Sequence, residues 1–181
     1  GYNMEATQLG NNVYLVNNQR ELVRYNFNTL TSFPTLAVPT GLTATNLSTA
    51  SGLRTTSWIV TALSQVGETI GSTPISLASL PQLLTQASVR VSWTPTSAAS
   101  GDLIGYNVYR GNPGDEIFIA GVDNETTRFD DTGAFSPDPF RVPPSADMTG
   151  GPIAKYITRF QDRLILAGLS GQPTRLMVSG R

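Results

Sequence analysis

The chain has 181 residues, a formal net charge of -1, one lysine and neither histidine nor cysteine. Disulfides, thiolate metal sites and catalytic sites built on histidine or cysteine are therefore excluded. The lack of a basic excess disfavours a nucleic-acid partner, and no apolar run reaches the roughly eighteen residues of a membrane helix. Abundant Ser, Thr, Asn and Gly beside 39% hydrophobic residues favour an all-β protein with many turns.

Two β-hairpins are predicted near the ends of the chain. Residues 11–27 contain two apolar runs separated by the turn cluster 17–20, and residues 161–179 contain two runs separated by turn material at 168–174. Both segments have the same order: a polar pair, an apolar strand, a small or amide residue, a loop and a strand that carries arginine. We interpret this shared order as a weak internal repeat. The alternative, that any two hairpins look alike, stays open.

Between the hairpins lies a series of short strands that alternate bulky and polar residues. Alternation of period two places Trp58, Val91, Trp93, Tyr106 and Val108 on core-facing sides. Turn residues separate the strands, which favours an antiparallel two-sheet β-sandwich. The expected strands lie within residues 33–45, 55–74, 87–95, 104–111, 116–122 and 126–133.

Two further segments carry weaker signals. Residues 75–86 have helix-compatible spacing, but Pro81 interrupts it, so at most a short helical turn is expected. Residues 134–152 are rich in proline and glycine and predict a linker or an extended crossing segment. The expected organisation is a hairpin at 1–35, a sandwich at 36–133, the linker at 134–152 and a hairpin at 153–181.

The central region resembles the fibronectin type III-like modules of bacteriophage virion proteins and bacterial surface proteins. The resemblance rests on "VRVSWTP", "GYNVYRG", "IFIAGV" and "TTRFDDTG", within roughly residues 38–133. It matches Trp93 to the core tryptophan, Tyr106 and Val108 to the strand packed across from it, and Phe129 to the closing segment. These residues, with Trp58 and Val91, form the predicted core.

The order of the segments departs from the usual module. The "WIVTALSQVGETIGS" segment, normally last, precedes "SWTP", so the module resembles a permuted one. The flanking hairpins, including "YITRFQDRLILAG", resemble blades of small propeller-like phage proteins. The resemblance implies a sandwich inserted between two propeller-type hairpins.

No catalytic, cofactor or metal site is predicted. Nucleotide-binding glycine motifs are absent. Asp123, Glu125, Asp130 and Asp131 could in principle hold calcium, but they lack the spacing of a calcium loop and are more simply explained as turn formers. Asp115 and Glu116 would point to opposite faces of a strand, which disfavours a carboxylate pair for glycoside hydrolysis.

The remaining mode of action is binding through surfaces. Arginine forks suit fixed contacts with carboxylates across an interface, and the candidate interface residues are Arg24, Tyr109, Arg110, Arg159, Arg163 and Arg175. The resemblance implies a non-catalytic structural protein of a phage virion, in the tail, neck or baseplate, contacting other virion proteins and copies of itself in a symmetric ring. The alternative is an adhesin-type module that binds host surface polysaccharide, with Tyr109 as an exposed aromatic platform.

Overall fold

The structure is a computed structural model, and it describes residues 3–82, 84–96 and 103–179. The outermost residues of both expected end hairpins lie outside these ranges. The chain forms two compact units. We call Gly1–Thr35 with Met148–Arg181 the two-sheet unit and Leu36–Asp147 the sandwich unit. The predicted all-β class is confirmed, with 48% strand, 2% helix and antiparallel sheets.

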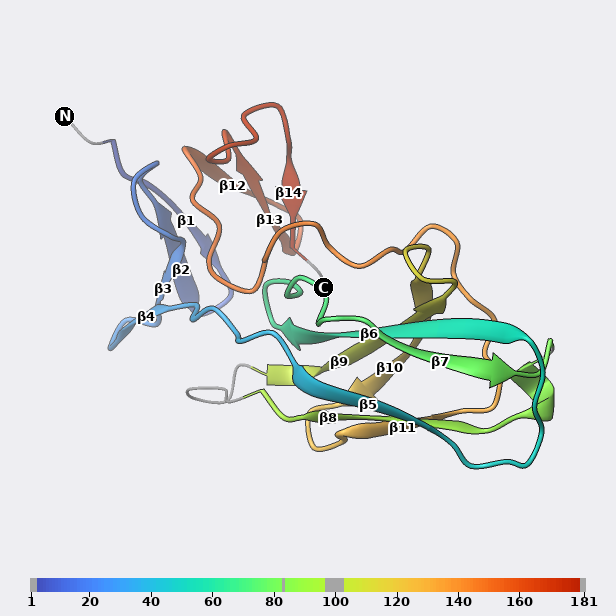
Figure 1. Ribbon diagram of the computed structural model, residues 1–181. Helices are drawn as coiled ribbons and strands as arrows, with labels where there is room; N and C mark the ends of the chain where they lie inside the picture. Colours follow the sequence, from blue (N-terminus) through green and yellow to red (C-terminus); the bar gives the residue numbers. More distant parts are fainter. Residues whose placement is uncertain (1–2, 83, 97–102, 180–181) are drawn as a thin grey trace. The chain divides into compact units, whose positions relative to one another are not determined.

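The sandwich unit consists of two antiparallel sheets that form separate layers (Figure 1). One sheet has the strand order β10-β9-β6-β7 and the other the order β11-β8-β5. The strands are β5 (Thr40–Asn46), β6 (Arg54–Ser64), β7 (Ile75–Leu80), β8 (Val89–Thr94), β9 (Leu103–Gly111), β10 (Ile117–Asp123) and β11 (Arg128–Asp131).

The inner faces of these sheets form one hydrophobic core. Along β6 and β9 the register pairs Val60 with Val108 and Ala62 with Tyr106, so the apolar residues of both strands share one face. Trp93 of β8 packs edge-on against Tyr106, with 5.3 Å between ring centroids. The six residues expected in the core all belong to this cluster: Trp58, Val91, Trp93, Tyr106, Val108 and Phe129.

The segment 75–86 differs from the sequence-based expectation. Ile75–Leu80 is strand β7, paired with β6, and only Leu84–Gln86 forms a short 3-10 helix. The helical spacing was misleading because burial against β6 outweighs local propensity. Ser79 has a φ of 60°, where the β6–β7 register shifts, and this irregularity hides the period-two signal.

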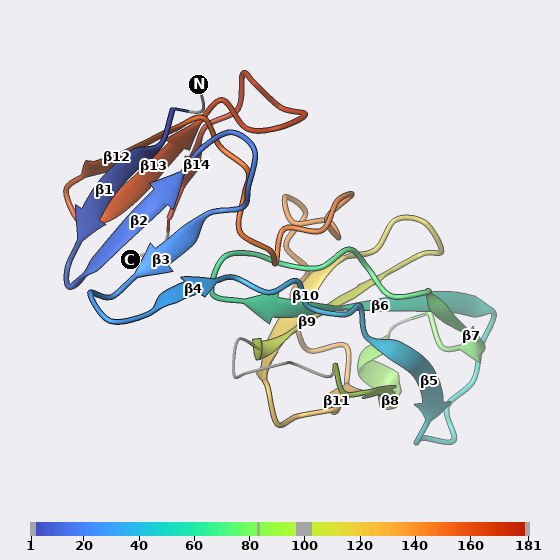
Figure 2. The same ribbon diagram turned by 90° about the vertical axis from the view of Figure 1, so that its left-hand side faces the viewer.

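The two-sheet unit brings the two ends of the chain together. Its strands are β1 (Glu5–Leu9), β2 (Asn12–Val16), β3 (Val23–Tyr25), β4 (Leu30–Ser32), β12 (Tyr156–Phe160), β13 (Arg163–Ala167) and β14 (Met177–Val178). They form the sheets β1-β2-β3-β4 and β12-β13-β14. The predicted hairpins are confirmed by the β2–β3 and β13–β14 pairings. β12 lies against β1 and β2, and both views show β1 beside β12 (Figure 2).

The segment 134–147 belongs to the sandwich unit and contacts the edge strand β10. The amide of Phe118 donates to the carbonyl of Arg141, and the amide of Asp138 donates to the carbonyl of Phe118. The Arg141 guanidinium stacks over the Phe118 ring at 3.6 Å. The segment therefore covers a sheet edge that would otherwise expose unpaired backbone groups.

Candidate interaction surfaces

Arg110 is a buried structural residue, so the expectation that it lies at an interface is wrong. Its guanidinium lies 2.5 Å from an oxygen of Asp131, and the two side chains are 8% and 0% exposed. The other Asp131 oxygen accepts from the indole N–H of Trp58 at 2.9 Å. The amide of Gly133 also donates to Asp131. Arg110 faces inward because its register partner on β6 is Trp58, a core residue.

Tyr109 is also buried, so it offers no exposed platform for a glycan. Its side of β9 faces away from the main core, but Phe118 packs edge-on against its ring at 5.9 Å. The phenol donates to Glu68 at 2.5 Å. Burial and then the hydrogen bond to Glu68 raise the pKa of Tyr109. A phenol held in its protonated form serves as a hydrogen-bond donor rather than as a catalytic base.

The other four candidate arginines belong to the two-sheet unit. Arg24 is half-buried, with its guanidinium 6.0 Å from the centre of the Phe33 ring. Arg159 bonds the carbonyl of Gln161. Arg175 is exposed and bonds Gln172 within its own loop. Arg163 is half-buried on β13.

The carboxylates considered for calcium serve other structural roles. Asp130 forms a two-point pair with Arg90 at 2.7 Å, and the guanidinium of Arg90 lowers the pKa of Asp130. Asp123 accepts from the amide of Thr126 in the β10–β11 turn. Among the described residues, no group of three or more acidic side chains is placed to hold a metal ion.

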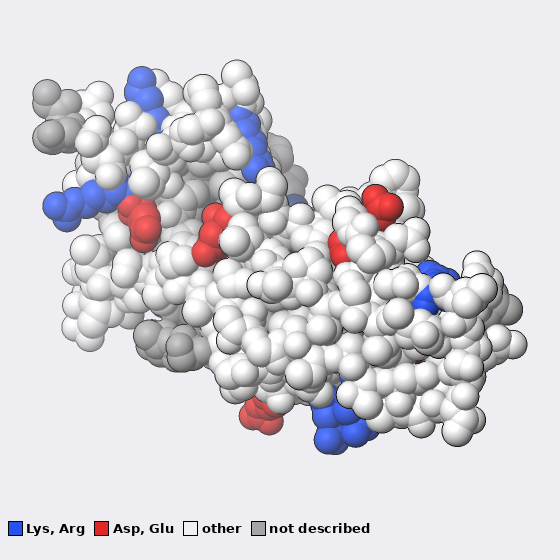
Figure 3. Space-filling model, viewed as in Figure 1, with Lys and Arg blue, Asp and Glu red and all other residues white. Residues whose placement is uncertain are grey.

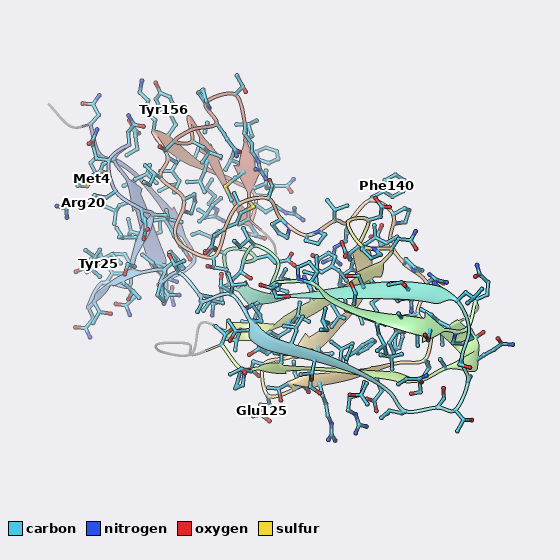
Figure 4. All side chains as sticks on the ribbon, viewed as in Figure 1. Met4, Arg20, Tyr25, Glu125, Phe140 and Tyr156 are labelled. Atoms are coloured by element: carbon cyan, nitrogen blue, oxygen red, sulfur yellow. The ribbon has the colours of Figure 1, made fainter. Side chains whose placement is uncertain are left out.

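A different feature stands out in the two-sheet unit: one face of the β1–β4 sheet is mostly apolar and partly exposed. We call it the N-face; the registers place on it Ala6, Gln8, Val13, Leu15, Val23, Tyr25, Leu30 and Ser32. The registers align Val13 with Tyr25 and Tyr25 with Leu30 across neighbouring strands. Leu30 is 66% exposed, and Met4, which precedes β1, is 65% exposed. Figure 4 shows Met4, Arg20 and Tyr25 on the side of this sheet that faces away from β12–β14.

The N-face is hollowed at one end. A concavity of about 580 Å³ lies beside the β2–β3 loop, and its lining comprises Met4, Leu15, Val16, Val23 and Leu30 together with the loop residues Asn17, Gln19, Arg20 and Glu21. Arg20 and Glu21 of that loop bring one cation and one anion to the rim. Val16, which alternation places on the other side of β2, is 2% exposed and reaches the same concavity. Tyr25 and Leu30 of the N-face are 36% and 66% exposed, so the more exposed part of the sheet lies at β3 and β4.

The β12–β14 sheet also has one buried and one open face. Ile157, Leu164 and Leu166 are buried on one side. We call the other side the C-face, formed by Tyr156, Thr158, Phe160, Arg163, Ile165, Ala167 and Val178. The register aligns Thr158, Ile165 and Val178 in one row across the sheet. Tyr156 and Phe160 are 50% and 64% exposed. Alternation of period two would leave such a face polar if it met only water.

Neither face was predicted from the sequence. The β2–β3 and β13–β14 hairpins were predicted, but β1, β4 and β12 were not, so the two sides of each sheet could not be assigned. The available signal was the run Tyr156–Phe160, in which Tyr156, Ile157 and Phe160 occupy both sides of one strand. A strand that is apolar on both faces is typical of a sheet covered on both sides.

Charged residues make up 14% of the chain. On the side of the molecule shown in Figure 3, blue and red atoms form small scattered groups among mostly uncharged surface. Across the part of the chain that the structure describes, no helix is long and apolar enough to cross a membrane.

The sandwich unit carries its own exposed apolar residues outside these faces. Phe140, 93% exposed, sits at the tip of the turn that is anchored to β10, and Figure 4 shows it projecting from that turn. Glu125, also labelled there, marks the β10–β11 turn. Leu53 is fully exposed before β6. Single exposed apolar residues are common on monomers, whereas contiguous apolar faces mark interaction sites.

Comparison with models of known protein families gives no match. Comparison with curated proteins gives no significant relative. The function of this chain is therefore inferred from its own residues and their geometry.

Proposed function

We propose that this chain is a non-catalytic structural component of a bacteriophage virion, in the tail, neck or baseplate, and that it acts through interfaces with copies of itself and with other virion proteins. The observation that carries the proposal is the pair of open apolar faces on the two-sheet unit. A protein that displays two such faces is suited to association rather than to turnover.

The strand order of the sandwich supports the family part of the proposal. A four-stranded sheet, β10-β9-β6-β7, faces a three-stranded sheet, β11-β8-β5. In the chain, β6 and β7 come before β8 and β9. In the larger sheet, β6 lies in the centre beside β9, and β7 forms the edge. This is the arrangement expected if the last two strands of a fibronectin type III-like module are moved ahead of its second strand.

The two-sheet unit supports the propeller part of the proposal. Two antiparallel sheets from opposite ends of the chain lie with their first strands, β1 and β12, against each other. Radially repeated sheets of this kind are the building blocks of propellers. The proposal implies that the chain resides in the virion and needs no cofactor.

The adhesin alternative is less well supported. It relied on an exposed Tyr109, which is 1% exposed. Among the exposed aromatic residues of the two-sheet unit, Tyr25, Tyr156 and Phe160 lie within the N-face and the C-face, and Phe27 lies in the β3–β4 turn.

Mass spectrometry of purified phage particles, with antibody labelling seen by electron microscopy, tests the proposal. The expected result is a fixed copy number per particle and label at one position on the tail, neck or baseplate. Absence of the chain from intact particles that carry the gene would contradict the proposal.

A further inference from the structure

We infer that the N-face of one copy packs against the C-face of a second copy, so that the chain assembles head to tail. This inference rests on the proposed function, because it names the surfaces through which copies would meet. Three features of the two faces lead to it: their difference in shape, their position in the unit and their area.

The two faces differ in shape in a complementary way. The end of the N-face beside the β2–β3 loop is hollowed by about 580 Å³. The C-face presents the rings of Tyr156 and Phe160, which are half to two-thirds exposed. A hollow does not fill itself when two copies of it meet, whereas aromatic side chains seated in an apolar hollow are typical anchors of an interface. The rim of the hollow carries Arg20 and Glu21, and Glu21 is the anion that would pair with Arg163 of the C-face.

The positions of the faces allow the contact to propagate. The two sheets pack against each other through one side of each, because β12 lies against β1 and β2. The N-face and the C-face are therefore the two outer sides of a two-layer stack. Joining the N-face of one copy to the C-face of the next repeats, between copies, the sheet-on-sheet contact already made within the unit. Two different patches joined in this way give a ring or an open filament, not an isolated dimer.

The areas are sufficient for such a contact. A large side chain exposes on the order of 200 Å², so the exposed apolar residues present roughly 300–450 Å² on each face. A standard interface buries about 800 Å² per partner and is a little over half apolar. Each face thus supplies most of the apolar centre of one such interface, with the flanking loops supplying the polar rim.

The test uses the full chain and three single variants. Leu30→Asp places a charge on the N-face and Phe160→Asp places one on the C-face; both side chains are about two-thirds exposed in the monomer. Leu53→Asp is the matched control, because Leu53 is fully exposed but lies in the sandwich unit. Circular dichroism checks folding, and Leu30→Ser and Phe160→Ser replace any variant that fails that check.

Sedimentation velocity then measures association. The wild type and Leu53→Asp are expected to form species larger than dimers. Leu30→Asp and Phe160→Asp are each expected to associate at least about tenfold more weakly, as for loss of a central apolar contact. An equimolar mixture of the two is expected to form dimers that grow no further, because each variant retains the one face that the other needs.

Three outcomes would overturn the inference. The wild type could remain monomeric, one variant could still self-associate while the other does not, or both could associate like the wild type. The second outcome would mean that a face pairs with itself, and the third that copies meet elsewhere. In the third case the proposed structural function would stand, because association would persist. Detection of the chain in particles tests that function independently.

Discussion

Replacing Asp131 with Asn should destabilise the sandwich unit far more than the conservative nature of the change suggests. The amide oxygen can still accept the indole N–H of Trp58, which lies 2.9 Å from the carboxylate. The amide cannot balance the charge of Arg110, whose side chain is only 8% exposed. A guanidinium would then remain buried without a counter-charge, at the junction of β6, β9 and β11.

The magnitude follows from that burial. Breaking a buried ion pair by removing one partner costs about 3–5 kcal/mol, because the remaining charge stays desolvated. A domain of this size has a total stability of about 5–15 kcal/mol, so the variant should lose a large part of it. Urea unfolding followed by tryptophan fluorescence is a suitable assay. Both tryptophans of the chain, Trp58 and Trp93, lie in the sandwich unit, so the signal reports on that unit alone.

The neighbouring residue on the same strand provides the control. Asp130 also pairs with an arginine, Arg90, but the two side chains are 43% and 38% exposed. Exposed pairs contribute about 0–1 kcal/mol, so Asp130→Asn should shift the unfolding midpoint little. The reasoning is refuted if Asp131→Asn costs no more than Asp130→Asn.

Three further predictions concern other parts of the sandwich unit. The pKa of Tyr109 is raised above its usual value of 10.0 in the folded state. The contribution of Tyr109 to the free energy of unfolding is therefore fully present below pH 10 and is lost as pH rises through the folded-state pKa. Tyr109→Phe should therefore flatten the decline in the unfolding free energy above pH 10; identical alkaline profiles would contradict this. Gly133→Ala should cost more than Gly114→Ala in urea unfolding, since both have positive φ but only at Gly133 would a Cβ meet backbone atoms, at 2.6 Å. The clash adds about 1–3 kcal/mol, and equal costs would argue against it. Arg141→Ala removes the stacking over Phe118 and should speed hydrogen exchange of the 138–142 turn without changing exchange in β6; unchanged exchange in the turn would show that backbone bonds alone anchor it.

The sandwich core was predictable because period-two alternation is a direct consequence of strand geometry. Trp93, Tyr106 and Val108 follow that period without interruption. The misassigned strand β7 lies where a positive φ at Ser79 breaks it. Local regularity therefore decided what could be predicted in this unit.

The candidate interface residues were harder to predict. Sequence patterns placed Arg110 on the same side of its strand as Tyr106, yet arginine was still expected at a surface because charged residues are almost never buried unless paired. The partner that permits burial, Asp131, is 21 residues away and becomes visible only in the fold. The open faces likewise depend on the meeting of β1 and β12 from opposite ends of the chain, which no local pattern encodes.

The native mass of the purified wild-type chain, measured over a range of concentrations, tests the central claim most directly. Head-to-tail association through the N-face and the C-face predicts species larger than dimers, with masses that are integer multiples of 19.4 kDa. A single 19.4 kDa species at every concentration would contradict it.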